Sequence, residues 1–306
     1  MACKKYDVII IGAGAAGLAA AIYCARYKLK TLVVSKELGG VIIDAHKVEN
    51  YPGFKEIPGI ELMDKFQEHA KSFGVEVRQD EIIEISKKEP FKVKTKKESC
   101  EAKALILAMG SERKRLDVHG EKEFRGKGIS YCYTCDAPFS KDKTVAVLGG
   151  SDSAARAAQL CAEYAKKIYI IYRGDKMRAE PYLVEQLEKN PKVKFIYNTN
   201  VVEVKGDKLI KSVVLNSKKE LKIELLFVEI GQVPNTALAK KLGVKLDEQG
   251  YIIVDESQKT NIGCIYAAGD ITNASNKFRQ LTTAISEGSI AAESIYKLIK
   301  KGVHET

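Results

Sequence analysis

Two cysteines three positions apart, Cys132 and Cys135, are the residues of this chain best suited to chemistry. They lie in the stretch GISYCYTCDAP, residues 128–138, and Asp136 follows them directly. Such a C-x-x-C pair can be half of a zinc site, two incidental buried thiols, or a dithiol that cycles with a disulfide. A redox pair needs a thiolate of lowered pKa and a nearby proton carrier, and Asp136 is the available acid. The spacing alone leaves the three interpretations open.

The other cysteines and the histidines argue against a metal. A structural zinc site normally takes four ligands, often from a second Cys or His pair. No second C-x-x-C exists, and the histidines are isolated from one another, at positions 46, 69, 119 and 304. The seven cysteines are odd in number and mostly scattered, which favours a reducing compartment over a secreted disulfide framework. We therefore predict a redox pair and no metal, with incidental thiols as the alternative.

The composition excludes several classes of protein. A chain of 306 residues with 45% hydrophobic and 29% charged residues suits one large or two ordinary globular domains. The net charge of +10 comes from 41 lysines and nine arginines spread along the chain, without the clustering of a nucleic-acid-binding module. The lysine excess instead predicts a solvated surface, or one that steers an acidic protein partner. The apolar stretch from Val8 to Cys24 contains three glycines and no uninterrupted run of membrane-spanning length, so we expect a cytoplasmic protein without membrane contact.

A glycine motif near the start predicts a dinucleotide-binding unit. Gly12, Gly14 and Gly17 form G-x-G-x-x-G between a hydrophobic strand and an amphipathic helix. Gly12 permits the tight turn, Gly14 allows a pyrophosphate to approach the backbone, and Gly17 lets helix and strand pack closely. The helix N-terminus then presents free N–H groups to phosphates. The candidates for a ribose contact at the end of the second strand are Ser35, Lys36 and Glu37.

A second, weaker unit follows the cysteine pair at residues 143–180. Its glycine turn contains Gly149 and Gly150, but Ser151 stands where a further motif glycine is usual, and Ala154 takes the close-packing position. The second strand ends at a tyrosine followed by Arg173, with Arg178 five residues on. A carboxylate there would favour NADH, whereas guanidinium groups suit the 2′-phosphate of NADPH.

Two such units predict two nucleotides that exchange electrons, one bound permanently and one diffusible. After a connector at residues 231–240, GCIYAAGD reads as a strand and LTTAISEGSIAAESIYKLI as an amphipathic helix that completes the first unit. The predicted fold is α/β, with two Rossmann-like domains, the second inserted into the first. The predicted boundaries are 1–115 plus 237–306 for the first domain and 116–236 for the second.

The order of these motifs resembles the low-molecular-weight thioredoxin reductase family over nearly the whole chain. The shared segments are the first glycine motif, VENYPGF, CYTCD, the second glycine motif, YRGDKMRAE, and AAGD followed by FRQ. The most specific is the C-x-x-C-D just before the second nucleotide motif. The larger glutathione-reductase class has its cysteine pair after the first motif, where this chain reads GGVIIDAH.

The resemblance implies cofactors, partners and roles. Cys135 would face a flavin, Cys132 would attack a partner's disulfide, and Asp136 would carry the proton. Asp270 would contact the ribitol, and Arg279–Gln280 would lie near the isoalloxazine ring. The implied FAD-binding residues are Gly12, Gly14, Ala15, Ala16, Gly17, Ser35, Lys36, Glu37, Gly39, Gly40, Asn50, Gly110, Gly269, Asp270, Arg279 and Gln280. The implied NADPH-binding residues are Gly149, Gly150, Ser151, Asp152, Ser153, Ala154, Arg173 and Arg178.

The chain departs from the family where the 2′-phosphate would bind. The family's His-Arg-Arg with a further arginine is here Tyr172-Arg173-Gly174, followed by Arg178. Each lost charge-assisted contact would weaken discrimination by about 1.5–3 kcal/mol, enough for NADH to compete.

The cysteines belong to the inserted domain but must meet both the flavin and an external disulfide. We therefore expect the inserted domain to swivel on two connectors, near Arg113–Leu116 and Gln232–Thr236.

The predicted function is a homodimeric thioredoxin-disulfide reductase that passes electrons from NADPH through FAD and the dithiol to a thioredoxin or glutaredoxin-like protein. One alternative keeps the flavin and dithiol but takes electrons from NADH, ferredoxin or a deazaflavin. Another is a non-catalytic flavoprotein that senses redox state.

Overall fold

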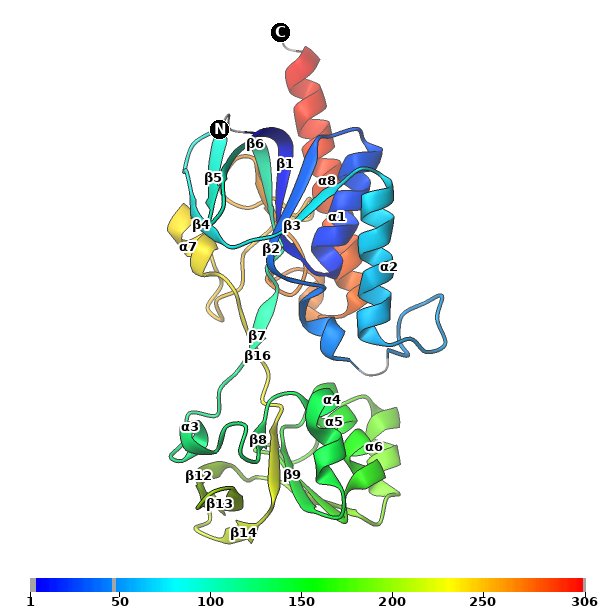
Figure 1. The fold of residues 1–306 in the computed structure, drawn as a ribbon, viewed down its shortest axis with the longest axis vertical. Helices are drawn as coiled ribbons and strands as arrows, with labels where there is room; N and C mark the ends of the chain where they lie inside the picture. The colour runs from blue at the N-terminus through cyan, green and yellow to red at the C-terminus, as the bar shows by residue number, and fades with distance from the viewer. Residues whose placement is uncertain (1–3, 46–47, 305–306) are drawn as a thin grey trace. The chain divides into compact units, whose positions relative to one another are not determined.

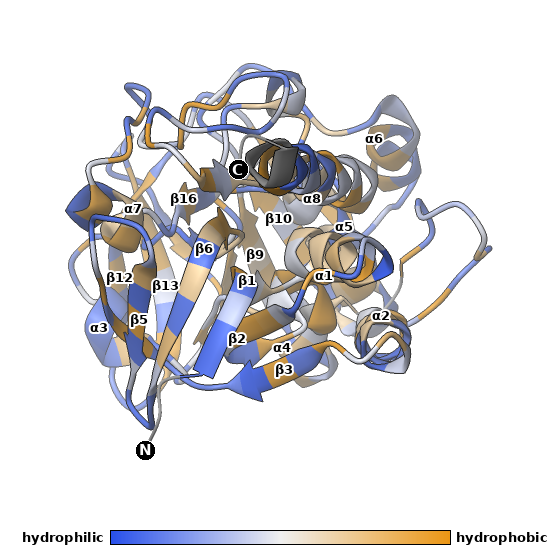
Figure 2. Cartoon of the chain, turned by 90° about the horizontal axis from the view of Figure 1, so that it is seen from above, coloured by the Kyte–Doolittle hydropathy of each residue, from blue (hydrophilic) through white to orange (hydrophobic). Residues whose placement is uncertain are grey.

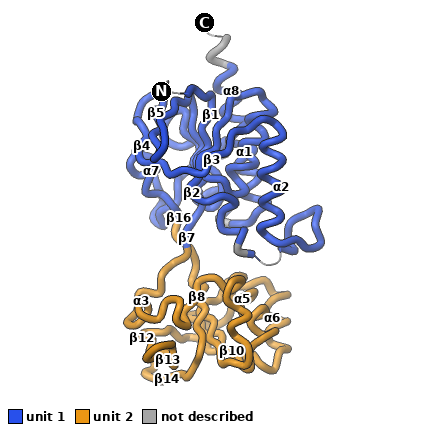
Figure 3. Tube along the Cα trace, viewed as in Figure 1, with its two compact units in different colours: residues 1–112, 234–306 blue, residues 113–233 orange. Residues whose placement is uncertain are grey.

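The computed structural model describes residues 4–45 and 48–304, which form two compact units (Figure 3). Unit 1 comprises Met1–Glu112 and Pro234–Thr306, and unit 2 comprises Arg113–Val233. Each contains a parallel sheet with helices packed on it, which confirms the predicted α/β fold with a Rossmann-like domain inserted into another. Within the described residues, no helix has the length and apolar character needed to cross a membrane.

The described part of unit 1 is organised around a seven-stranded sheet of order β3-β2-β1-β6-β5-β4, in which β17 also pairs with β6 (Figure 1). The pairs β3-β2, β2-β1, β1-β6 and β6-β17 are parallel, while β5 pairs antiparallel with β6 and β4. Its strands are β1 (Lys4–Ala13), β2 (Thr31–Leu38), β3 (Glu76–Gln79), β4 (Ile82–Ile85), β5 (Phe91–Thr95), β6 (Ser99–Leu107) and β17 (Ile265–Ala267). Its helices are α1 (Ala15–Arg26), η1 (Gly40–Asp44), α2 (Gly59–Ser72), α7 (Ala237–Leu242), η3 (Ser275–Lys277) and α8 (Leu281–His304).

The second half of strand β1, residues 8–11, is apolar on both faces because both faces of the sheet are covered there. Val8 and Ile10 pack into the core shared with α1 and α8, whereas Ile9 and Ile11 pack into the core shared with α7. Figure 1 shows α1, α2 and α8 together on one side of the sheet.

Unit 2 has a parallel sheet of order β11-β10-β9-β15-β8 and a three-stranded antiparallel sheet of order β12-β13-β14. Helices α5 and α6 share a core with one face of the parallel sheet, and the antiparallel strands share a core with the other.

Figure 2 shows hydrophobic residues on elements of both units, such as α1 of unit 1 and β9 of unit 2, and hydrophilic residues in the loops. The remaining elements belong to unit 2. The strands are β8 (Ile129–Ser130), β9 (Thr144–Leu148), β10 (Lys167–Ile171), β11 (Val193–Ile196), β12 (Val201–Gly206), β13 (Ile210–Leu215), β14 (Glu220–Lys222) and β15 (Leu225–Val228). The helices are α3 (Glu121–Phe124), α4 (Tyr133–Asp136), η2 (Ala137–Ser140), α5 (Asp152–Tyr164) and α6 (Pro181–Glu188).

The two connecting segments pair with each other as β7 (Ser111–Arg113) and β16 (Gln232–Pro234). Backbone hydrogen bonds continue beyond this pair, from Lys114 N–H to Gly231 O at 2.9 Å and from Asn235 N–H to Gly110 O at 3.0 Å.

The contact between Gly12 and Gly17 yields a stability prediction. A Cβ on Gly17 would lie closer than 3.0 Å to the carbonyl oxygen of Gly12, whereas a Cβ on Gly14 would meet only Gly40 Cα, at 3.9 Å. Gly17→Ala should therefore lower the free energy of unfolding by about 1–3 kcal/mol, and Gly14→Ala should have a much smaller effect. Urea denaturation of both variants, stripped of cofactor and followed by circular dichroism, measures the difference. Equal destabilisation would contradict the argument.

Candidate functional site

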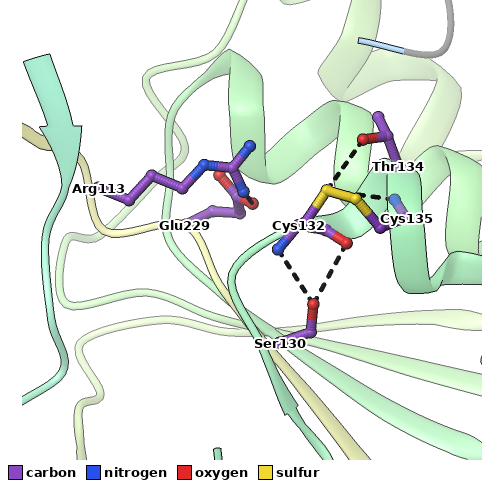
Figure 4. Close-up of a disulfide and its surroundings, with 6 residues drawn as sticks. All are labelled: Arg113, Ser130, Cys132, Thr134, Cys135 and Glu229. Atoms are coloured by element: carbon purple, nitrogen blue, oxygen red, sulfur yellow. Dashed lines mark hydrogen bonds and ion pairs between the residues drawn. A yellow bond between two sulfur atoms is a disulfide. The ribbon is translucent and has the colours of Figure 1, made fainter. Parts of the chain in front are cut away.

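Cys132 and Cys135 form a disulfide at the start of α4, with Cα atoms 5.3 Å apart (Figure 4). The Cys132 side chain is half-buried and that of Cys135 is exposed. Cys132 Sγ accepts a hydrogen bond from Cys135 N–H at 3.3 Å and lies 3.2 Å from Thr134 Oγ1. Donors aimed at a sulfur stabilise its thiolate, so these contacts favour Cys132 as the sulfur that carries the charge after reduction.

Ser130, at the end of β8, holds the loop that carries the first cysteine. Cys132 N–H donates to Ser130 Oγ at 3.0 Å, and Ser130 Oγ–H donates to Cys132 O at 3.2 Å. One helical turn later, the half-buried Asp136 donates its N–H to Cys132 O at 3.1 Å. The predicted proton carrier thus follows the pair on the same turn of backbone. Among the residues that the structure describes, no cluster of three or more His, Cys, Asp or Glu could hold a metal.

In unit 1, the glycine turn leaves the N-terminus of α1 open. The helix begins at Ala15 after Gly14, which makes no side-chain cap, and its first turn contains no acidic residue. Gly39 N–H donates to Ala13 O at 3.0 Å, and Gly40 lies against Gly14. A turn of this kind presents N–H groups and a positive helix end to a pyrophosphate.

The loop that follows β17 brings residues from late in the sequence next to the first turn of α1. A Cβ on Gly269 would lie 2.9 Å from Ala16 Cβ, so β17 delivers Gly269 and Asp270 next to the glycine motif. Burial raises the pKa of the Asp270 carboxyl to about 6, an effect that Arg279 opposes and Glu287 reinforces.

Arg279 carries the clearest sign of a ligand in unit 1. Its guanidinium carbon lies 3.9 Å from the centroid of the Tyr251 ring. Its Nε and Nη2 atoms are buried, and no group in the described part of the chain accepts a hydrogen bond from them. Since buried charged donors without acceptors are unfavourable, these atoms fit a polar ligand such as FAD. The neighbouring Gln280 accepts a hydrogen bond from Asn50 Nδ2 at 3.0 Å.

The other predicted residues of unit 1 lie at the end of β2 and at the connector. Lys36 and Glu37 are exposed near the end of β2, where Ser35 Oγ–H donates to Glu37 O at 2.5 Å. Gly110 has a left-handed φ of 61° and lies at the connector, where it accepts the hydrogen bond from Asn235.

In unit 2, Tyr172 fills the space beside the glycine turn. A Cβ on either Gly150 or Gly174 would lie 2.6 Å from its ring, so the aromatic side chain lies close to both glycines. Gly149 has φ of 151°, and a Cβ there would lie closer than 3.0 Å to Glu229 O. A larger residue at either Gly149 or Gly150 would therefore collide with a neighbouring group.

The remaining predicted residues surround this turn. Arg178 N–H donates to Gly150 O at 2.6 Å, and its exposed side chain lies 5.9 Å from the Tyr172 ring centroid. Arg173 is exposed directly after Tyr172. Asp152 Oδ1 accepts Glu180 N–H at 2.8 Å. Of the others, Ala154 is buried, Ser151 is half-buried and Ser153 is exposed.

The sequence reasoning missed two buried acidic residues, Glu287 and Glu229. Glu287 accepts hydrogen bonds from Gly269 N–H at 2.8 Å, Thr272 Oγ1 at 2.9 Å and Ser275 Oγ at 2.6 Å, and so fixes the loop that carries Asp270. Its only signal in the sequence is a carboxylate among the small and apolar residues of SEGSIAA. Glu229 is a second such acid, placed in the apolar run LLFVEIG.

Comparison with known proteins agrees with this site. The family model described as pyridine nucleotide-disulphide oxidoreductase matches residues 6–288. A thioredoxin reductase from Listeria innocua is 40% identical over 97% of this chain and 95% of its own. Crystal structures of thioredoxin reductases from Lactococcus lactis and T. acidophilum superpose with TM-scores of 0.92 and 0.90, at 35% and 38% identity, and each comparison covers 97% of this chain and 99% of the other. The chain therefore belongs to the pyridine nucleotide-disulphide oxidoreductase family and, within it, to the low-molecular-weight thioredoxin reductases.

The disulfide leads to a simple prediction about thiol content. The denatured, oxidised protein should yield two fewer reactive thiols than the same protein after dithiothreitol treatment, because Cys132 and Cys135 are bonded. Labelling with a maleimide reagent and mass spectrometry counts them. Cys132→Ser should abolish the difference, while Cys161→Ser, which removes a buried free thiol, should keep it. An unchanged difference in Cys132→Ser would contradict the pairing.

Proposed function

We propose that the chain is a thioredoxin-disulfide reductase that uses NADPH, FAD and the Cys132–Cys135 pair to reduce the disulfide of a thioredoxin-like protein. The observation that carries the proposal is a disulfide with one exposed cysteine on α4, which packs against α5 of one nucleotide-binding unit in a chain that contains a second such unit. Family membership makes the protein an oxidoreductase and implies a flavin and a nicotinamide cofactor.

We propose residues 1–115 and 237–306 as the FAD-binding domain. FAD, when bound, supplies a flavin ring that takes two electrons from the nicotinamide and passes them to the disulfide. The open N-terminus of α1 would hold its pyrophosphate, and Asp270 would accept a hydrogen bond from its ribitol. The free buried N–H groups of Arg279 supply donors for the flavin end.

We propose residues 116–236 as the NADPH-binding domain that carries the cysteines. Gly149–Ala154 would bind the pyrophosphate, and Arg173 and Arg178 would bind the 2′-phosphate as charge-assisted donors. The hydrogen bonds to Cys132 Sγ support this cysteine as the nucleophile that attacks the partner's disulfide. Asp136 would carry the proton.

A specific observation favours an alternative donor. The Tyr172 ring lies against Gly150 and Gly174. Tyr172 and Gly174 stand at the positions where the family pattern has a histidine and a further arginine. A site with one arginine fewer would discriminate less against NADH. The second candidate is therefore the same flavin and dithiol chemistry with NADH, ferredoxin or a deazaflavin as donor.

Anaerobic titration of the purified flavoprotein with NADPH and, separately, NADH tests the donor. We expect loss of the yellow flavin absorbance with NADPH at concentrations at which NADH reacts much more slowly. Equal bleaching by both would establish dual specificity, and bleaching by neither, while dithionite still reduces the flavin, would exclude nicotinamide as donor.

The role of Arg173 can be measured in the same way. Arg173→Ala should lower kcat/KM for NADPH by about 10- to 100-fold and leave NADH nearly unchanged, because it removes a contact made only to the 2′-phosphate. Lys194→Ala, an exposed charge in the middle of β11, is the matched control and should alter neither value. An equal loss with both nucleotides would show that Arg173 supports the fold rather than reads the phosphate.

The protein substrate and the assembly complete the proposal. Thioredoxin reduction, followed by insulin precipitation, should require both Cys132 and Cys135. Size-exclusion chromatography with light scattering tests the homodimer that the family resemblance predicts.

A further inference from the structure

Glu229 occupies a particular place at the edge of the unit 2 sheet. It follows β15, which lies between β8 and β9, with Phe227 paired to Ser130 and Val228 paired to Leu148. Its N–H donates to Leu148 O at 2.8 Å. Since parallel strands lie about 4.8 Å apart and end at a common edge, Glu229 stands between the segment that leads to Cys132 and the glycine turn.

Side chains alternate between the two faces of the sheet along β15, and this alternation places the Glu229 side chain on the face covered by α5. Leu225 and Phe227 belong to the core shared with α5, whereas Leu226 and Val228 belong to the opposite core. Glu229 therefore points toward α5, against which α4 also packs. Figure 4 shows it in the surroundings of the disulfide, with its carboxylate toward Arg113.

The Glu229 carboxyl is buried, and one of its two oxygens lacks a hydrogen-bond donor among the described residues. The Glu229 side chain is 8% exposed, and its Oε1 lies 3.7 Å from Arg113 Nη1, longer than a hydrogen bond. In the described part of the chain, no group donates a hydrogen bond to Oε1. Buried carboxylate oxygens are normally hydrogen-bonded in a native structure, so an oxygen that faces, among the charged groups of the described residues, only the distant Arg113 guanidinium is an exception that asks for a functional reason.

Burial and charge together set the protonation of this acid. Burial raises the pKa of Glu229 to about 7, and Arg113 from β7 opposes that rise. From α5, Cys161 also faces Glu229: burial raises the pKa of this thiol to about 12, with Ser140 lowering it and Glu229 raising it further. The acid thus exchanges a proton near neutral pH, in the surroundings of the disulfide.

We infer that Glu229, paired with Arg113, is a positioning residue for the redox chemistry. Glu229 takes up a proton when the Cys132–Cys135 disulfide is reduced and releases this proton when the disulfide re-forms. The inference rests on the dithiol cycle of the proposed function. Two electrons break the S–S bond and leave two negative charges on the sulfurs. One proton converts one sulfur to a thiol, and Glu229 binds a second proton while the other sulfur stays a thiolate. When that thiolate attacks the partner's disulfide, a mixed disulfide forms and one partner sulfur leaves as a thiolate. The other cysteine then loses its proton and re-forms the Cys132–Cys135 bond, which releases the second partner sulfur. The proton from this cysteine and the proton that Glu229 gives back convert the two partner sulfurs to thiols.

The coupling follows from electrostatics in both directions. Protonation of Glu229 makes its pair with Arg113 one unit more positive, and positive charge near a cysteine favours its thiolate. A thiolate in turn favours the protonated carboxyl, because linkage between two sites is reciprocal.

The test is the pH dependence of thiol alkylation in the full-length flavoprotein. The protein is reduced with dithiothreitol, freed of reductant anaerobically and pulsed with iodoacetamide from about pH 5.5 to 9, a range that spans the ordinary thiol titration. Mass spectrometry of the peptide that contains Cys132 and Cys135 gives the rates, with buried Cys161 as background.

Wild-type protein should show two inflections, the lower one from Glu229. Glu229→Gln, which keeps the shape of the side chain, should show one inflection, with a midpoint lower than the upper wild-type step by about half a pH unit, a threefold change in the thiolate equilibrium. Glu229→Asp should retain two inflections. Glu185→Gln, which removes an exposed carboxylate on α6, should retain the wild-type profile. Two inflections in Glu229→Gln, or their loss in Glu185→Gln, would overturn the inference.

A stability measurement provides an independent check. The pKa of Glu229 rises from 4.5 to about 7 on folding, so between these pH values the folded protein binds more protons than the unfolded chain. Stability from this group therefore falls as pH rises through that window, and Glu229→Gln should be stabilised relative to wild type at pH 8 but not at pH 4.5. Equal effects at both pH values would contradict a titrating Glu229.

These measurements separate the inference from the proposed function. Alkylation involves neither the nicotinamide nor the protein substrate. An altered profile without reductase turnover would contradict the proposed function alone, whereas normal turnover with an unaltered profile in Glu229→Gln would contradict this inference alone.

Discussion

Both units depend on a backbone contact that only residues without a large side chain allow. In unit 1, Gly17 lies against the carbonyl of Gly12, so that α1 starts directly above the end of β1. In unit 2, Gly149 lies against the carbonyl of Glu229, and the buried Ala154 lies against Gly149. The contact brings the positive end of a helix to the carboxyl edge of a parallel sheet, which is where such folds bind ligands.

Buried charged side chains lie at the carboxyl edges of both parallel sheets. Asp270 and Arg279 lie at the edge in unit 1, and Glu229 and Arg113 lie at the edge in unit 2. The covered centre of each sheet excludes charge: residues 8–11 of β1 and 145–148 of β9 are apolar and buried, and the two acids follow the ends of β17 and β15. Each edge therefore combines an open helix end with an acid whose pKa burial raises, to about 6 for Asp270 and about 7 for Glu229.

The disulfide owes its character to the short element that carries it. β8 is only two residues long and leads, through the Ser130 turn, into the four-residue helix α4. The turn orients Cys132 so that the N–H of Cys135 meets its sulfur. In this arrangement Cys132 is half-buried and Cys135 remains exposed. Asp136 is close because it is next in the chain, and Glu229 is close because the sheet brings β15 beside β8.

The sequence by itself determined the features that are local. The spacing of Gly12, Gly14 and Gly17, the apolar run before them and the helix after them predicted the first nucleotide-binding unit, because turn, strand and helix signals lie within one short segment. The Cys132–Cys135 pair was identified by its spacing for the same reason. The late strand could be assigned to the first unit because its pattern matched a missing part of that fold.

Only the tertiary structure decided which distant side chains meet. The antiparallel β12-β13-β14 sheet, the packing of Tyr172 against Gly150 and the Glu287 hydrogen bonds follow from strand order and side-chain packing, which local patterns do not encode. Glu229 was hidden in an apolar run, where a single acid has no periodicity to reveal it. Glu229 follows β15, and Arg113 lies in the connecting strand β7, more than a hundred residues earlier in the chain. Glu229 approaches Arg113 only because the fold brings these two segments together at one edge of the unit 2 sheet.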